Sequence, residues 1–529
     1  MTDQGPDMLP TRAATMRRAP ARPADAARRV VRSLPLPLRA RLRRAAAWCD
    51  RRPVPSIEDW SRPLIGAHAG SEASRHEVFG AAPAAAGLGV VEPAQSPIPA
   101  TAGSANLPVV RCLVVTSLLD VGGMDEVVAF LARRLPAHRL QTAVLHATCD
   151  PSATGEPRGR LGRMLASTGI KVHEADENGA PAWIEQWHPD VISAHGAPGW
   201  VLPIAQRLGV PYVDNLHGMH MLFEADWQAE AARGAKVAAI VSVSELVRQQ
   251  YLAGNRDFPA DRIVLIPNGV DDQRRSGGDR AAARARLGLT DEYVFVSLAR
   301  YSLQKNAYGL LTAFAELARQ RPEVHLVIAG WADNVRYYRQ VVRLRDSLPC
   351  RDRIHLRDHV AAPAELLGAA DGFVLDSFFE GWSLASMEAL FAGLPVVLSD
   401  VGGAREQIGG DPARGYLVTN PLGDPLSANW ESVGAACTRA QVNRDEFVAA
   451  MEHLVADRED YLRDRERLTA ESAARFSAGA CLARHAAVLR AVGTGADLPG
   501  GQYADAAPLG SPSGRAPVST HLSGGNGGL

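Results

Sequence analysis

The stretch VVRCLVVTSLLDVGGMDEVVAFLARRL, residues 109–135, contains the unit from which this chain is built. Its first eleven residues are mostly apolar and β-branched, which favours a buried strand. From Met124 to Leu135 the apolar residues instead recur at helical spacing. The connecting loop holds two adjacent glycines, Gly122 and Gly123, which let a ligand approach the backbone closely. The stretch therefore predicts a strand, a glycine loop and a helix.

The same alternation recurs along the chain. Short buried runs follow, among them TAVLHA, DVISAHG, YVDNLHG, AAIVSVS and RIVLIPNG, and amphipathic segments separate most of them. After a charged, Arg/Ala-rich stretch at residues 279–287 the alternation restarts with YVFVSLAR, VHLVIAG, RIHLRDH, GFVLDS and PVVLSD. Buried strands alternating with helices form parallel sheets covered on both faces. The restart near residue 285 indicates two such α/β domains in series, whose ligands bind beyond the carboxyl ends of the strands.

Composition narrows the functional class. The chain has 529 residues, too many for one ordinary core, and a hydrophobic content of 46% that suits a soluble globular protein. A net charge of -1 gives no overall attraction to nucleic acid or anionic lipid. Six scattered cysteines without C-x-x-C argue against a zinc site or disulfide framework and suit a reducing compartment. With no apolar signal segment and no run of about eighteen apolar residues, a cytoplasmic protein is expected.

Both ends of the chain differ from its middle. Residues 1–105 are Ala/Pro/Arg-rich and predicted to be mostly disordered, and residues 493–529 form a predicted flexible Gly/Pro/Ser-rich tail. Thirteen arginines stand within residues 11–52, four of them beside Leu38 and Leu42. A short amphipathic helix there would contact an anionic inner membrane face. The alternative is a solvated arginine-rich extension without a membrane role.

The stretch FFEGWSLASMEALFAG, residues 378–393, holds the first candidate site residues. It predicts a loop carrying Glu380 and then a helix that starts near Ser383 or Leu384 and carries Glu388. In one interpretation, each of the two carboxylates contacts a different part of a bound ligand. In the other, Glu388 is a solvated helix residue and Glu380 is a capping or loop acid without a ligand.

The start of that helix predicts a phosphate cradle. The N–H groups of Leu384, Ala385 and Ser386 have no partner inside the helix and carry the positive end of its dipole, which suits a diphosphate. Glu388 lies one turn further on the same face, where it would accept hydrogen bonds from a ribose diol. Glu380 would then face the group attached to the far phosphate.

Two cations follow the first strand of the second domain. The stretch VSLARYSLQKNAYGLLTAF, residues 296–314, places Arg300 and Lys305 in the loop before a helix, as a clamp for a diphosphate would require. The alternative is a solvated pair of charges. That alternative is weaker for Lys305, because Lys171 and Lys236 are the only other lysines of the chain.

Two further motifs are less specific. IPNGVDD, residues 266–272, is a strand end with an Asn-Gly turn before the second domain. DNLHGMH, residues 214–220, puts His217 at a strand end, and a single histidine there is more often structural than functional.

Taken together and in this order, these motifs resemble the family-4 retaining glycosyltransferases of the GT-B fold, over roughly residues 108–490. The resemblance rests on the E-x7-E pair Glu380 and Glu388, the R-x4-K pair Arg300 and Lys305, IPNGVD, the first-loop GG, the HG at His217, and SDVGGAREQI at residues 399–408.

The resemblance implies two Rossmann-like domains that face each other across a cleft. The domain boundaries expected from it are 1–105 for the extension, 106–275 for the N-terminal acceptor domain, 276–475 for the C-terminal sugar-nucleotide domain, 476–492 for a last helix (about 480–491) that crosses back to the first domain, and 493–529 for the tail.

The family also implies roles for the site residues. Arg300 and Lys305 would bind the diphosphate, Glu388 the ribose and Glu380 the sugar hydroxyls. His217 would approach the sugar from the first domain. The loop of Gly122 and Gly123 would lie near the phosphates, together with the helix start at Ser383, Leu384 and Ala385.

No metal and no cofactor are implied, because cations and a helix dipole would neutralise the leaving diphosphate. The front-face chemistry of this family needs a positioned acceptor more than a protein nucleophile, so Glu380 is expected to position the sugar.

The chain also departs from the family pattern at three places. Gly381-Trp382-Ser383 replaces Gly-Phe-Gly, with Ser383 as an expected helix cap; Arg357-Asp358 replaces Leu-Gly near the base pocket; and Met124-Asp125 replaces Ala-Glu near the acceptor side.

The sequence therefore predicts a retaining transferase that moves a sugar from a nucleoside diphosphate, by default UDP, to a saccharide or lipid-linked acceptor in envelope or exopolysaccharide synthesis. A non-catalytic subunit that binds a nucleotide sugar is the alternative. The four intact residues Arg300, Lys305, Glu380 and Glu388 argue against that alternative. No nucleic-acid motif appears, so no nucleic-acid partner is expected.

Overall fold

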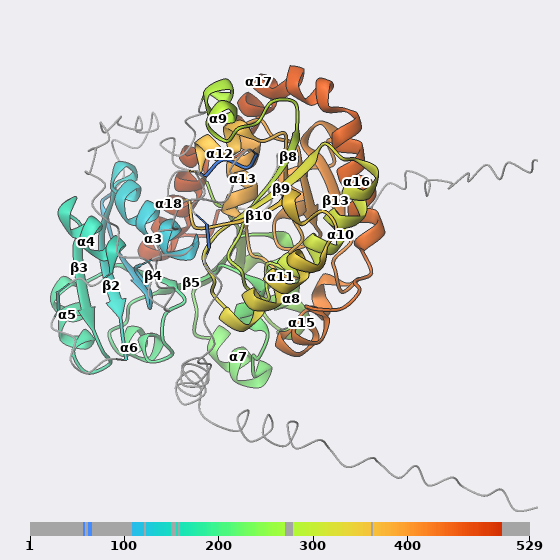
Figure 1. Ribbon diagram of the computed structural model, residues 1–529. Coiled ribbons are helices and arrows are strands. Elements are labelled where there is room, and N and C mark those ends of the chain that lie inside the picture. The colour runs from blue at the N-terminus through green and yellow to red at the C-terminus, as the bar shows by residue number, and fades with distance from the viewer. Residues whose placement is uncertain are drawn as a thin grey trace, which may run out of the picture. The chain divides into compact units, whose positions relative to one another are not determined.

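The alternation seen in the sequence becomes two parallel sheets in the computed structural model (Figure 1). The structure describes residues 57–58, 62–65, 108–120, 123–149, 155–156, 159–269, 279–360 and 363–499. One sheet has seven strands and the other six, and every strand pair is parallel. The predicted α/β class with two Rossmann-like domains is confirmed.

The first sheet has the strand order β3-β2-β1-β4-β5-β6-β7. The order reverses between β1 and β4, so the loops after these two strands form the switch point at which such sheets bind ligands. Its strands are β1 (Val110–Thr116), β2 (Leu140–Ala147), β3 (Lys171–Ala175), β4 (Val191–His195), β5 (Tyr212–Leu216), β6 (Ala239–Ser242) and β7 (Ile263–Leu265). Its helices are α3 (Gly123–Arg134), α4 (Arg160–Ser167), α5 (Ala180–Trp187), α6 (Val201–Arg207), α7 (Trp227–Gly234) and α8 (Glu245–Gly254).

The second sheet has the order β10-β9-β8-β11-β12-β13 and reverses between β8 and β11. The loops that carry Lys305 and Glu380 follow these two neighbouring strands, so the topology alone brings them to one edge. The strands are β8 (Tyr293–Leu298), β9 (Val324–Ala329), β10 (Ile354–Arg357), β11 (Gly372–Leu375), β12 (Val396–Ser399) and β13 (Gly415–Val418). The helices are α9 (Arg280–Arg286), α10 (Ala307–Gln320), α11 (Val335–Ser347), α12 (Ala364–Ala369), α13 (Leu384–Phe391), α14 (Ala404–Ile408), α15 (Trp430–Ala436), α16 (Arg444–Ala456) and α17 (Arg458–Arg475).

The last helix, α18 (Ala478–Thr494), packs against the first sheet rather than the second. It contacts β1 and β4, and its residues Leu482 and Leu489 are buried in the same core cluster as Cys112 and Val114 of β1. The linker residue Gly269 lies against the start of α18, where a Cβ would stand 2.9 Å from the Cα of Ala478. The asparagine-glycine turn of IPNG therefore allows the linker to pass close beneath this helix.

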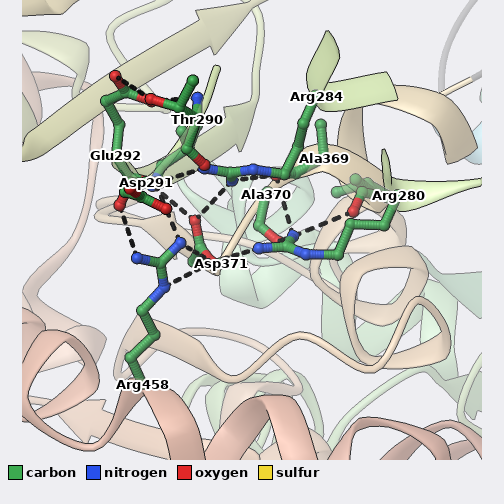
Figure 2. Close-up of polar contacts among 12 residues, drawn as sticks. Arg280, Arg284, Thr290, Asp291, Glu292, Ala369, Ala370, Asp371 and Arg458 are labelled. Carbon is green, nitrogen blue, oxygen red and sulfur yellow. Dashed lines mark hydrogen bonds and ion pairs between the residues drawn. The ribbon is translucent and has the colours of Figure 1, made fainter. Parts of the chain in front are cut away.

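A cluster of arginines secures the amino end of β11 (Figure 2). Asp371 is buried immediately before β11, and its carboxylate pairs with Arg280 at 2.6 Å, Arg284 at 3.2 Å and Arg458 at 3.1 Å. Arg280 also donates to the carbonyl of Ala370, beyond the last turn of α12. Helices α9 and α17 are thereby fixed to the strand whose opposite end leads to Glu380.

A short part of the predicted extension contacts the second domain. Glu58 forms a parallel bridge with Arg357 on β10, and its carboxylate accepts from the buried Arg357 guanidinium at 2.6 Å. The N–H of Asp358 donates to the Glu58 carbonyl, and that of Leu64 donates to the Leu287 carbonyl. The arginine-rich segment with Leu38 and Leu42, and the tail after residue 499, lie outside the described residues. Among the described helices, none is long and apolar enough to cross a bilayer.

Candidate active site

The helix predicted at the phosphate cradle begins where expected. Helix α13 starts at Leu384, and Ser383 caps it by accepting a hydrogen bond from the Ser386 N–H at 3.3 Å. Leu384 and Ala385 are partly exposed, so the first turn is accessible to a ligand. The predicted cap at Ser383 is confirmed.

A second helix start lies beside it. Gly123 is the first residue of α3, and a Cβ on Gly123 would stand 3.9 Å from Cδ1 of Leu384. The first turns of α3 and α13, one from each domain, therefore lie near each other, and each carries the positive end of its helix dipole. This arrangement suits a doubly charged anion such as a diphosphate. Gly122, the other glycine of this predicted loop, lies outside the described residues.

Lys305 and Glu380 form an ion pair. Lys305 Nζ lies 2.5 Å from Glu380 Oε1, and both side chains are largely buried. The Ser377 hydroxyl donates to the same carboxylate oxygen at 2.7 Å, and Gln304 Nε2 donates to Oε2 at 3.2 Å. Three donors thus fix the orientation of the Glu380 carboxylate.

The loop around Glu380 is held by its backbone. Gly403 N–H donates to the Gly381 carbonyl at 2.9 Å, and Asn420 Nδ2 donates to the Phe378 carbonyl at 3.1 Å. Gly402 is in the left-handed region at φ 47°, and a Cβ there would stand 2.4 Å from the Gly381 carbonyl oxygen. The glycines of SDVGGAREQI therefore act here as a close-packing surface for the loop that carries Glu380.

A buried amide and carboxyl network holds the Lys305 loop, and sequence reasoning missed it. Asn306, in the left-handed region at φ 50°, caps α10, and its Nδ2 donates to the Asp376 carboxylate at 2.8 Å. Asn443 Nδ2 donates to the other Asp376 oxygen at 2.8 Å. Burial raises the pKa of Asp376 to about 8, and these two hydrogen bonds oppose the shift. The sequence feature that could have indicated this network is Asp376, an acidic residue at the end of the apolar stretch GFVLD.

Arg300 belongs to the same region but has its own partner. Its guanidinium pairs with Asp333 at 3.2 Å and lies 6.0 Å from the centre of the Trp331 ring. Desolvation of its ring lowers the pKa of His220, although the residue as a whole is exposed; the charge of Glu380 opposes this shift, while those of Arg300 and Lys305 add to it. His220 of the first domain therefore lies within electrostatic range of three predicted site residues.

His217 lies at the contact between the domains. The N–H of Met219, two residues on, donates to the Glu380 carbonyl at 3.3 Å. His217 Nε2 lies 2.7 Å from Nδ1 of His195, at the end of β4. Burial, together with the nearby His485 and His220, lowers the pKa of His217 to about 3. The ring is therefore neutral at physiological pH.

Two glutamates complete the region. Glu388 is buried on α13, one turn beyond Leu384, in the position predicted for a ribose contact. Glu406, inside the SDVGGAREQI motif, accepts from the Glu245 N–H at the start of α8 at 2.7 Å. Glu406 is a second link between the domains that sequence reasoning did not identify.

The two domains match models of known protein families. The family described as Glycosyl transferases group 1 matches residues 279–433, and that described as Glycosyltransferase Family 4 matches residues 121–274. A D-inositol 3-phosphate glycosyltransferase of Stackebrandtia nassauensis is 30% identical over 336 residues, covering 54% of this chain and 72% of that protein. The protein of the same name from Geodermatophilus obscurus is 29% identical over 371 residues, covering 63% and 80%.

Solved structures resemble the chain in fold. Anabaena HepE in complex with UDP-glucose superposes with a TM-score of 0.56 and 18% identity, covering 71% of this chain and 97% of that one. Sucrose-phosphate synthase from Thermosynechococcus elongatus gives a TM-score of 0.57 and 17% identity, covering 73% and 100%.

Proposed function

The chain is a glycosyltransferase of group 1 and family 4 with the GT-B fold, and from this we propose that it uses a UDP-sugar and retains the anomeric configuration. The acceptor we propose is a saccharide or a lipid-linked saccharide of the cell envelope or of an exopolysaccharide. The observation that carries the proposal is the ion pair of Lys305 and Glu380 beside the paired starts of α3 and α13.

The charges of this region suit a sugar diphosphate. An ammonium group has three N–H donors, and Lys305 uses one of them on Glu380, which leaves two for phosphate oxygens. The dipoles at Gly123 and Leu384 add positive potential from both domains. We infer that these groups, with Arg300, stabilise the leaving diphosphate without a metal ion.

The sugar is then placed beside Glu380. Its carboxylate is oriented by Lys305, Ser377 and Gln304, which favours fixed hydrogen bonds to sugar hydroxyls over attack on carbon. Glu388, one turn into α13, is assigned to the ribose. Given the proposed retention and no assigned protein nucleophile, we infer that the acceptor attacks on the face that the diphosphate leaves, a reaction that depends on positioning.

A specific observation adds one more acceptor. The relatives from Stackebrandtia nassauensis and Geodermatophilus obscurus are named D-inositol 3-phosphate glycosyltransferases, so inositol 3-phosphate is the second candidate. UDP is proposed as the nucleotide because HepE was solved with UDP-glucose. The alternative of a non-catalytic nucleotide-sugar-binding subunit is kept as an outcome of the test.

The test has two stages. Thermal unfolding with UDP-, GDP- and ADP-sugars should show a rise in Tm for a UDP-sugar, because ligands that bind the native state stabilise it. Release of UDP is then measured with saccharide, lipid-linked and inositol 3-phosphate acceptors, with and without EDTA, and the anomeric configuration of the product is read by proton NMR. Stabilisation without hydrolysis or transfer would favour the non-catalytic subunit. An inverted product, or activity lost with EDTA and restored by a divalent metal, would overturn the proposed mechanism.

A further inference from the structure

Four buried or partly buried polar side chains form a continuous chain of hydrogen bonds that ends at His217. Asn215 Nδ2 lies 3.2 Å from Ser193 Oγ, and Ser193 Oγ lies 3.0 Å from His195 Nε2. His195 Nδ1 lies 2.7 Å from His217 Nε2. The chain crosses from β5 to β4 and then to the residue after β5, because these strands are neighbours in the first sheet.

The donor-to-acceptor direction of these hydrogen bonds follows from Asn215, the first residue of the series. The Asn215 amide nitrogen also lies 2.9 Å from the Ala194 carbonyl oxygen, which can only accept, so nitrogen must occupy this position. Its second hydrogen then points to Ser193 Oγ. A hydroxyl oxygen can accept two hydrogen bonds, but among the described residues the single Ser193 hydrogen has no acceptor within reach other than His195 Nε2. We therefore assign Nε2 of His195 as the acceptor of this hydrogen.

The two imidazole rings carry this direction onward. A neutral imidazole has one N–H and one acceptor nitrogen, so acceptance at Nε2 places the His195 hydrogen on Nδ1. Nδ1 of His195 then donates to Nε2 of His217, and the hydrogen of His217 must be on Nδ1. The two nitrogens of an imidazole diverge, so this N–H points away from His195.

Both rings must be neutral for this argument, and their surroundings keep them so. Burial lowers the pKa of His195 well below its ordinary value, and the nearby His217 and His485 act in the same direction. The pKa of His217 is lowered to about 3 by burial, His485 and His220. His485 on α18 is itself buried, with a pKa lowered to about 4. Within the part of the chain that the structure describes, the charged groups acting on the two rings are histidines and not carboxylates.

We propose that His195, oriented by Ser193 and Asn215, is a positioning residue that holds His217 as the Nδ1–H tautomer. His217 then offers a hydrogen-bond donor, and not an acceptor, to an oxygen of the transferred sugar. The contact with the sugar rests on the proposed function. Its structural basis is the proximity of His217 to the Glu380 loop, where its carbonyl oxygen would lie 1.7 Å from a Cβ on Gly381.

The assignment makes a chemical distinction. A donor at Nδ1 binds a sugar hydroxyl or ring oxygen through its lone pairs and cannot take a proton from the acceptor hydroxyl. With His195 fixed, His217 would act by orienting the sugar, and general-base catalysis is not its role.

The first experiment reads the tautomer without reference to activity. The full chain is labelled with 15N in histidine, and long-range 1H–15N spectra are recorded at pH 7, with His217 assigned by comparison with His217→Gln. We expect Nδ1 of His217 to be of the protonated type and Nε2 of the unprotonated type, with the same pattern in His195. An Nε2–H tautomer of His217 in the wild-type protein would overturn the proposal, whether or not the protein transfers sugar.

The second experiment removes the directing group. Ser193→Ala deletes one small hydroxyl and should leave His217 as a mixture of tautomers, whereas His195→Asn, whose amide nitrogen stands near the Nδ1 position, should retain the Nδ1–H form. With an active sugar nucleotide, Ser193→Ala should lower kcat/KM by up to about tenfold, the loss of roughly one hydrogen bond, and affinity for free UDP should be unchanged. If His217 were still purely the Nδ1–H tautomer in Ser193→Ala, Ser193 would not be the residue that sets the direction of these hydrogen bonds. If neither the wild-type protein nor any variant transfers sugar, the proposed function is wrong, but the result for the tautomer of His217 is unaffected.

Discussion

Gly381 lies so close to His217 that a Cβ on the glycine would stand 1.7 Å from the His217 carbonyl oxygen. This contact joins the loop of Glu380 to the first domain, and no side chain fits between them. The first domain thus reaches the site through its backbone at His217 and Gly218, with the hydrogen bond from Met219 to Glu380 beside it.

Gly381→Ala should therefore force the two domains apart and reduce transfer by at least about tenfold, because small displacements of positioned groups are costly in catalysis. Steady-state kinetics and thermal unfolding measure the effect. The matched control is Gly434→Ala, in helix α15, where a Cβ meets no atom within 4 Å. That change should be neutral or slightly stabilising. Wild-type kinetics in Gly381→Ala would contradict the close contact.

Glu380→Gln and Lys305→Ala should each abolish most transfer while the fold persists. Loss of one preorganised electrostatic contact typically lowers kcat by about 10²–10³. Far-ultraviolet circular dichroism should be unchanged, and Lys305→Ala should also weaken binding of free UDP. The control is Lys236→Ala, an exposed lysine beyond α7 that lies outside the site. Transfer at the wild-type rate by both variants would contradict the assignment of the pair.

Asp371→Asn should destabilise the second domain strongly. The buried carboxylate pairs with Arg280, Arg284 and Arg458, and removing one partner of a buried ion pair typically costs about 3–5 kcal/mol. The control is Asp346→Asn, whose exposed pair with Arg345 should contribute less than about 1 kcal/mol. Urea unfolding compares the two variants, and equal midpoints would argue that the arginine cluster is not a stabilising element.

His485→Leu should make stability less dependent on pH. Burial lowers the pKa of His485 to about 4 from an ordinary value of 6.5, so the unfolded chain binds a proton that the folded protein does not. The contribution of neutral His485 to the free energy of unfolding is therefore complete above pH 6.5. It is lost as the pH falls toward 4, by about 1.4 kcal/mol per pH unit. Urea unfolding at pH 7.5, 6.0 and 5.0 should show a shallower decline in the variant. The control is His188→Asn at an exposed helix end, and identical slopes in His485→Leu and wild type would contradict this account.

The arginine-rich segment at residues 11–52 is tested by two shortened chains. A chain starting at Pro55 keeps the contact of Glu58 with Arg357, whereas one starting at Asn106 loses it. If the segment binds membranes, the full chain should sediment with anionic vesicles at low salt, and the chain from Pro55 should not. The chain from Asn106 should also unfold at a lower temperature, because the buried Arg357 loses a carboxylate partner. Equal sedimentation of the full chain and the chain from Pro55 would exclude the segment as a membrane anchor.

Local patterns were sufficient for much of the architecture. The period of apolar residues distinguishes strand from helix within a single segment, so the two series of strands and the start of α13 could be predicted from neighbouring residues. The cap at Ser383 is equally local, since it involves a residue only three positions away. The placement of Lys305 and Glu380 at one sheet edge required one further rule, that ligands collect where the strand order reverses.

The sequence alone determined the two α/β domains and the start of α13 with its cap at Ser383, and it predicted the residues that we propose bind a diphosphate there. Tertiary structure alone decided which of these groups touch: Glu380 with Lys305, Asp376 with Asn306 and Asn443, and Glu58 with Arg357. It also decided that His217 would be held by His195 from the neighbouring strand. The physical reason is that these contacts join residues from 22 to 299 positions apart, and a hydrogen bond of less than about 3 Å depends on packing that no local periodicity specifies.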